Sequence, residues 1–232
     1  MIQGLRLLEL KACGSNISDQ DYAKIMKIFG QETITLYQAK KFMKRKVPIK
    51  AISVDMCVNS CIAFTLDFSN LTNCPICNES RFYSEQNQKK SRKVACYFPL
   101  IQRFKLQFGH YERAQLLRYR STYQRIPGIY QDIFDGTLYQ QHLSNGLFSD
   151  SRDIILIGSL DGYQLFRQKR DDCWVIMFIN CNLAPDIRVK KQNLLIGAII
   201  PGPKSPNNMN SFFAPIINKL KKLEGMYKSL YK

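Results

Sequence analysis

Four cysteines are spaced like the ligands of a metal site. Three residues separate Cys57 from Cys61, two separate Cys74 from Cys77, and twelve lie between the pairs. Two short-spaced thiol pairs of this kind are typical of a tetrahedral structural zinc site, which contributes about 10–16 kcal/mol of apparent binding free energy in small modules. Because four thiolates leave no open coordination position, this zinc is expected to stabilise the fold and not to catalyse a reaction. Four buried free thiols or two disulfides are the alternatives.

The other cysteines and the wider composition place the chain in a reducing compartment. Cysteines outside the two pairs lack ligand spacing and are expected to be core thiols: Cys13, Cys96, Cys173 and Cys181. The N-terminal apolar stretch is too short for a secretory signal, and no run of about 18 apolar residues predicts a membrane-spanning helix. We therefore expect an intracellular protein that does not bind membranes.

Positive charge is the strongest compositional signal. The chain has 34 Lys and Arg against 18 Asp and Glu, a net charge of +16 over 232 residues. Such a field attracts polyanions, and DNA is the partner we expect, with a solubilising surface or an anionic membrane as the alternatives. About six phosphate contacts would give log K a slope of roughly −5 against log salt. The cations expected to contact DNA lie in several patches: Lys40, Lys41, Lys44, Arg45 and Lys46; Lys89, Lys90, Arg92 and Lys93; and Arg118 and Arg120.

The elements that would hold these residues change in character along the chain. Residues 1–50 show helical periodicity, with Ser18 and Thr35 each placed as a helix N-cap. Residues 51–83 carry the cysteine element with short β segments, and residues 84–150 are a basic linker followed by helical, aromatic-rich sequence. These three segments precede a more regular part, residues 151–232.

Three short apolar runs dominate residues 151–232. The runs 153–160, 174–182 and 194–200 are rich in Ile and Val and bounded by turn signals, so each predicts a buried strand. The links between them are short, which favours antiparallel neighbours. A helix is expected over 211–225, capped by Ser211 and stopped by Gly225. The fold class expected is therefore α+β.

Several segments together resemble the transposase domain of the Tnp2 family, found in CACTA-type (En/Spm) DNA transposons. They are CVNSCIAF, NCPICNESRFY, RKVACYFPLIQRF, IGSLDGYQLF, INCNLAPDIRVKKQNLLIGAIIPGPKSP and SFFAPIINKLKKLEG, in that order from about residue 5 to about residue 225. The resemblance implies a zinc-ribbon-like element leading into a ribonuclease-H-like core of the DDE/D type. Such a core opens with three antiparallel strands followed by a helix, and its first catalytic carboxylate lies on the first strand.

The resemblance assigns that carboxylate to Asp161, which follows the apolar run IILIGSL. Enzymes of this type cut and join DNA with two Mg²⁺ or Mn²⁺ ions held by three acids, about 3.5–4 Å apart. The competing interpretation is that Asp161-Gly162 is only a hairpin turn. With either interpretation, we expect the strand to end there and to leave the carboxylate exposed.

The second and third acids of such a core would follow the helix, but the sequence ends a few residues after it. We therefore expect a truncated, transposase-derived protein that has no activity by itself and acts in the nucleus. The alternatives are a noncatalytic zinc-dependent DNA-binding protein and an interaction module that pairs with itself or another transposase subunit through residues 1–50.

Overall fold

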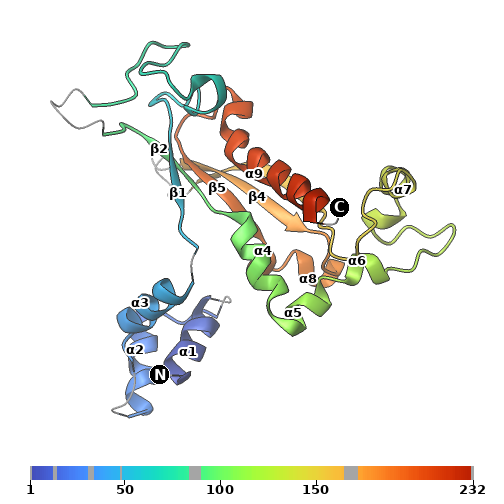
Figure 1. The fold of residues 1–232 in the computed structure, drawn as a ribbon. Coiled ribbons are helices and arrows are strands. Elements are labelled where there is room, and N and C mark those ends of the chain that lie inside the picture. The colour runs from blue at the N-terminus through green and yellow to red at the C-terminus, as the bar shows by residue number, and fades with distance from the viewer. Residues whose placement is uncertain are drawn as a thin grey trace.

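A computed structural model describes residues 2–12, 15–30, 34–47, 49–83, 90–164 and 172–230, with side chains as far as residue 222. Three helices come first: α1 (Ile2–Ala12), α2 (Asp19–Ile28) and α3 (Leu36–Lys46). They pack around a small core of Leu7, Tyr22 and Met26, in which the Tyr22 hydroxyl donates to the carbonyl of Gly4 at 3.0 Å. Figure 1 shows these helices beyond the end of the sheet, joined to it by the segment that enters β1.

Five strands form one antiparallel sheet in the order β1-β2-β5-β4-β3. Their bounds are β1 Ile52–Asp55, β2 Val94–Tyr97, β3 Leu156–Gln164, β4 Asp172–Asn180 and β5 Leu195–Pro201. β3 is an edge strand of the described sheet and pairs with β4 along its whole length, from Leu156 opposite Asn180 to Gln164 opposite Asp172. The cysteine segment supplies β1 and the following segment supplies β2, so both contribute to the same sheet as residues 151–232.

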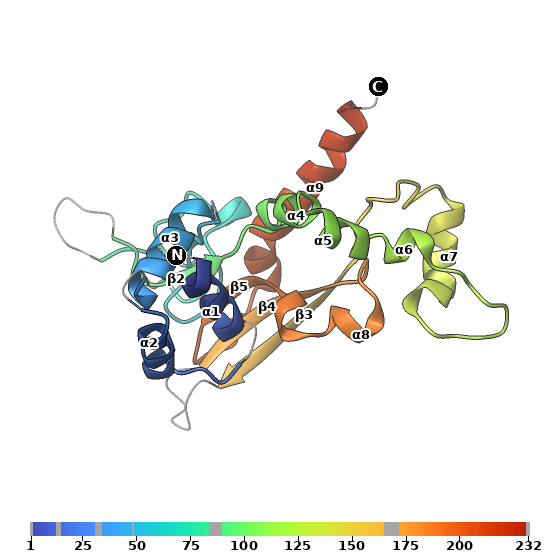
Figure 2. The same ribbon diagram turned by 90° about the horizontal axis from the view of Figure 1, so that it is seen from below.

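Two helices cover one face of the sheet, α4 (Leu100–Phe108) and α9 (Met209–Leu230). Phe212 and Ile216 of α9 and Phe104 of α4 share a core cluster with Ile176 and Phe178 of β4. Leu160 of β3 lies opposite Ile176 and packs against this cluster. Figures 1 and 2 agree that α4 and α9 lie on the same side of the sheet.

The chain between α4 and β3, and the loop between β4 and β5, hold short helices. They are α5 (Tyr111–Leu116), α6 (Tyr119–Thr122), α7 (Thr137–Ser144) and α8 (Pro185–Arg188), with 3₁₀ turns at Leu66–Phe68, Ile133–Asp135 and Lys191–Asn193. A buried ion pair between Arg188 and Asp132 joins α8 to the segment before α7, and the Tyr119 hydroxyl donates to the same carboxylate at 2.9 Å. Within the described chain, no helix has both the length and the apolar character that crossing a bilayer requires.

The structure confirms the mixed α+β class and the three consecutive antiparallel strands followed by a helix. Two details of α9 were wrong. Asn208 caps the helix by accepting the backbone N–H of Ser211 at 3.1 Å, whereas the Ser211 hydroxyl lies inside the first turn and accepts from the N–H of Ala63 at 2.9 Å. Gly225 does not stop the helix, whose backbone continues to Leu230.

The expectation that the first strand ends at Asp161-Gly162 was also wrong. Asp161 pairs with Val175 and Gly162 with Trp174, and β3 runs on to Gln164. The indole ring of Trp174 lies 3.5 Å from where a Cβ on Gly162 would stand, which is an ordinary packing distance within a strand. The Asp-Gly pair therefore lies inside a strand and is not a hairpin turn.

Candidate metal centre and cationic surfaces

The four paired cysteines converge on one point. Their Sγ atoms all lie within 4.8 Å of one another, and Cys57 Sγ is 3.4 Å from Cys77 Sγ. A Zn–S bond of about 2.3 Å gives sulfur–sulfur edges of about 3.8 Å in a tetrahedron. Cys57, Cys61 and Cys74 are buried and Cys77 is half-buried. Size, donor type and burial therefore fit a structural zinc ion held by Cys57, Cys61, Cys74 and Cys77.

Tight turns bring each pair of thiols to this point. In the first, the N–H of Ser60 donates to the carbonyl of Cys57 at 2.9 Å, and Ser60 takes a positive φ of 60°. In the second, the N–H of Asn78 donates to the carbonyl of Cys74 at 2.8 Å, with φ of 57° at Asn78. A left-handed residue directly after or within each turn lets the chain reverse so that both sulfurs of a pair face the same side.

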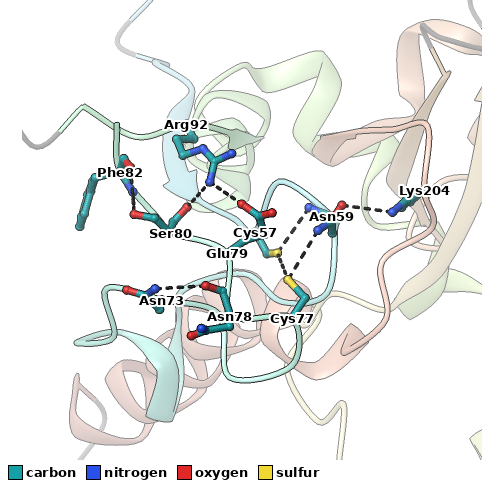
Figure 3. Close-up of polar contacts among 10 residues, drawn as sticks. All are labelled: Cys57, Asn59, Asn73, Cys77, Asn78, Glu79, Ser80, Phe82, Arg92 and Lys204. Atoms are coloured by element: carbon teal, nitrogen blue, oxygen red, sulfur yellow. Dashed lines mark hydrogen bonds and ion pairs between the residues drawn. The ribbon is translucent and has the colours of Figure 1, made fainter. Parts of the chain in front are cut away.

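Hydrogen bonds to sulfur favour thiolates on one side of the cluster. Asn59 donates its backbone N–H to Cys57 Sγ at 3.4 Å and its side-chain amide to Cys77 Sγ at 3.6 Å (Figure 3). Burial acts to raise the pKa of Cys77, but the Glu79 N–H, the Asn59 amide and the neighbouring thiols lower it to about 6. Burial raises the pKa of Cys57, and it raises the pKa of Cys61 to about 12. Zinc binds thiolates, and the lowered pKa of Cys77 favours a thiolate before the metal binds. Cys61, with its raised pKa, loses its proton only when zinc binds.

The cysteine element is bonded to the end of the sheet. Lys93 donates to the carbonyl of Val58 at 3.3 Å, the hydroxyl of Ser60 at 3.1 Å and the carbonyl of Gly202 at 3.0 Å. Lys204 donates to the Asn59 side-chain carbonyl at 3.1 Å (Figure 3). Both cations lie beside the site, and four thiolates on one zinc carry a net charge of −2, so these lysines offset that charge.

Further bonds tie the element to α9 and to β1. The Thr65 hydroxyl donates to the Ser211 carbonyl at 2.5 Å, and the N–H of Asn208 donates to the Cys61 carbonyl at 2.9 Å. Arg81 forms an ion pair with Asp55 of β1 at 2.7 Å and lies over the ring of Phe64. The roles of Asn59, Lys93 and Arg81 were missed from the sequence because each depends on chain segments that only the fold brings together.

Asp161 stands apart from the cysteine cluster, on β3. Its side chain is exposed, and the residues opposite it across the sheet are Val175 and then Ile199. Because neighbouring residues of a strand point to opposite faces, Asp161 lies on the face away from Leu160 and therefore away from α9. Among the described residues, the cysteines form the one group of three or more metal-ligating side chains that lie close together, so Asp161 belongs to no such group.

The cations expected to contact DNA fall into two groups. One group is exposed: Lys40, Lys41, Lys44, Arg45 and Lys46 on α3, together with Lys90 and Arg118. Lys89 lies outside the described residues.

The members of the second group are bonded to other groups of the protein. Arg120 is 5% exposed and donates to the backbone carbonyls of Phe148, at 3.0 Å, and of Asp153, at 3.1 Å. Lys93 is half-buried in the contacts given above, and Arg92 forms an ion pair with Glu79 at 2.7 Å. Arg120 is therefore withdrawn from the surface, whereas Lys93 and Arg92 stay partly exposed and are bonded to groups of the protein itself.

A groove of about 500 Å³ lies beside Arg120 and was not foreseen. Aromatic side chains line much of it, among them Tyr123, Phe134, Tyr139 and Phe148, and Arg125 stands exposed at its rim. These rings already pack on one another, with Phe134 and Tyr139 centroids 4.9 Å apart. The groove is therefore bordered by a self-packed aromatic cluster.

One part of the chain matches a known protein family. Residues 136–228, which hold β3, β4, β5 and most of α9, match the family described as "Transposase family tnp2". No curated protein and no solved structure matches the chain. The match supports a transposase family domain over residues 136–228.

Proposed function

We propose that this protein is a transposase-derived, DNA-acting protein of the nucleus, and that β3, β4, β5 and α9 are the opening part of a ribonuclease-H-like core. The observation that carries the proposal is the run of three consecutive antiparallel strands followed by a long helix, within the residues that match the transposase family. The CACTA-type origin is part of the same proposal and rests on the segments quoted from the sequence.

In this proposal Asp161 corresponds to the first catalytic carboxylate. Asp161 is exposed on β3, an edge strand of the described sheet, and this edge is where the proposal expects a further strand to pair. A two-metal centre for DNA cleavage needs several carboxylates around Mg²⁺ or Mn²⁺. Since Asp161 belongs to no group of three described metal-ligating side chains, the proposal takes the remaining ligands from another segment or another chain, and this chain does not cut DNA by itself.

A strand-cleavage assay on duplex DNA with Mg²⁺ or Mn²⁺ tests this proposal. We expect no cleavage from the chain alone. Metal-dependent cutting that disappears in Asp161→Ala, but not in the matched surface variant Asp186→Ala, would overturn the statement that further ligands are needed. It would at the same time support Asp161 as a catalytic residue.

A second candidate function is noncatalytic, zinc-dependent DNA binding. The convergence of the four thiols favours it, because that site is complete whereas the site at Asp161 is not. Under this alternative, chelation of the metal abolishes duplex binding, and Asp161→Asn changes neither that binding nor its response to Mg²⁺. Under the transposase proposal, Mg²⁺ strengthens binding to a duplex end in the wild type more than in Asp161→Asn.

A further inference from the structure

Helix α3 carries five cations and no acid in eleven residues. All five are exposed, and none of them forms an ion pair with a described acid. Among the other described cations expected to contact DNA, Arg92, Lys93 and Arg120 are bonded to carbonyls or carboxylates. α3 holds the largest group of exposed cations on one described helix. Its surface is therefore a concentrated source of positive potential.

Four of the five cations of α3 lie in two rows on one side of the helix, and the fifth, Lys46, lies outside the rows, with its Nζ over the Phe42 ring. Lys40 and Lys44 are four residues apart and form one row, and Lys41 and Arg45 form the other. Tyr37, which is 71% exposed, lies between the rows at the N-terminal end, with Lys41 Nζ 5.7 Å from its ring centre. Like charges at this spacing destabilise a helix, so the arrangement costs stability unless a polyanion neutralises it.

The opposite side of α3 is packed in the three-helix core. Ala39 is fully buried, and Leu36 packs against the cluster of Leu7, Tyr22 and Met26. The Thr35 capping box and the bond from the Val47 N–H to the Met43 carbonyl fix both ends of the helix. The small core therefore holds one side of α3, and the two cation rows are exposed to solvent. Figure 1 shows the helix beyond the end of the sheet.

We propose that α3 binds duplex DNA along the major groove, with its two cation rows facing the phosphates of the two strands. An α-helix with side chains is about 10–12 Å wide and the major groove is about 12 Å wide, so the helix fits between the two backbones. Tyr37, between the rows, would then face the base edges. This inference rests on the proposed DNA-acting function and adds the element that makes the contact.

The packing of α3 disfavours an anionic membrane as the ligand. Interfacial helices insert an apolar face between lipid headgroups. The apolar side of α3 faces the three-helix core, through Ala39 and Leu36. A helix whose outward side is cationic matches phosphates on a solvated polyanion better than a lipid interior.

The test compares two full-length variants that lose the same charge. The α3 variant is Lys40→Gln, Lys41→Gln, Lys44→Gln and Arg45→Gln. The control variant is Lys24→Gln, Lys27→Gln, Lys221→Gln and Lys222→Gln, all exposed and on α2 or α9. Glutamine keeps the helix propensity of lysine and arginine, and circular dichroism checks that both variants retain the helix content of the wild type. Fluorescence anisotropy with a labelled duplex of about 30 base pairs follows binding across salt concentrations.

We expect the α3 variant to lose about 3.6 units of slope in log K against log salt, about 0.9 for each of four phosphate contacts. Between about 50 and 200 mM salt, the wild type then loses about 150-fold more affinity than the α3 variant. The control variant keeps the wild-type slope to within about one unit. Methyl green, which occupies the major groove, is expected to displace the wild type, and the minor-groove ligand netropsin is not.

Several results would overturn the inference. Equal losses in the two variants would mean that only net charge matters, and displacement by netropsin alone would place the contact in the minor groove. α3-dependent binding to phosphatidylserine vesicles without duplex binding would assign α3 to membranes. If the wild type binds the duplex and the two variants have equal salt slopes, only the role of α3 is refuted. If the wild type does not bind the duplex at all, the proposed function is refuted as well.

Discussion

Replacing Cys74 with serine separates a structural zinc site from a set of buried free thiols. Cys74 is 1% exposed and belongs to the second thiol pair. Its side chain takes no part in the hydrogen bonds that join the cysteine element to α9, so the substitution reaches those bonds only through the metal. If zinc holds the two turns together, losing one ligand releases the element from the sheet.

The expected loss of stability follows from the hydrogen bonds that join the cysteine element to α9 and the residues before it. Ser211 bonds to Ala63 at 2.9 Å and to Thr65 at 2.5 Å, and the N–H groups of Asn207 and Asn208 donate to carbonyls in the first cysteine turn at 3.1 and 2.9 Å. Four hydrogen bonds at about 1 kcal/mol each amount to about 4 kcal/mol. For a chain of this size, that loss lowers the melting temperature by about 8–16 °C.

Thermal unfolding with and without a strong chelator, combined with elemental analysis, measures this effect. The wild type is expected to contain zinc, and its melting temperature should fall by about 8–16 °C when the zinc is chelated. Cys74→Ser is expected to have the lower melting temperature from the start, and the chelator should not change it. The matched control is Cys173→Ser, a buried cysteine of β4 outside the ligand set, which keeps its zinc and its chelator response. Less than about half a mole of zinc per mole, with no chelator response, would refute the reasoning.

Three further predictions concern acids elsewhere in the fold. Asp132→Asn leaves the buried charge of Arg188 without its partner, so the free energy of unfolding in urea should fall by about 3–5 kcal/mol; a loss below about 1 kcal/mol would contradict this. The Tyr123 hydroxyl, followed by backbone N–H groups, lowers the pKa of Asp135, so its contribution to stability is complete above pH 4 and is lost as pH falls through the lowered pKa. In Tyr123→Phe, the free energy of unfolding should therefore fall less steeply as the pH is lowered below 4. An unchanged pH dependence would contradict the role of the Tyr123 hydrogen bond. Asp161→Asn removes an exposed carboxylate and should change the unfolding free energy by less than about 0.5 kcal/mol, whereas a larger loss would show that Asp161 has a structural role.

Local patterns predicted the elements well where a short-range interaction fixes them. Ser18 and Thr35 each begin a helix with a complete capping box, as the polar residues before each apolar run indicated. The three apolar runs of the last third form the strands β3, β4 and β5 because short links make antiparallel pairing the simplest arrangement. The four thiols converge as their spacing predicted.

Expectations that depended on distant contacts were less successful. Asp-Gly favours a turn locally, but the pairing of Asp161 with Val175 and of Gly162 with Trp174 keeps both residues inside a strand. The basic sequence around Arg120 predicts an exposed cation, but its guanidinium donates hydrogen bonds to the backbone carbonyls of Phe148 and Asp153. Lys93 likewise bridges segments more than a hundred residues apart, and a sequence pattern does not show such partners.

The salt dependence of duplex DNA binding by the full chain tests the central claim most directly. The account predicts binding whose log K falls against log salt with a slope of about −5, as about six phosphate contacts require, with most of that slope contributed by α3. Absence of duplex binding at low salt, or affinity that does not change with salt, would contradict a DNA-acting role for this protein.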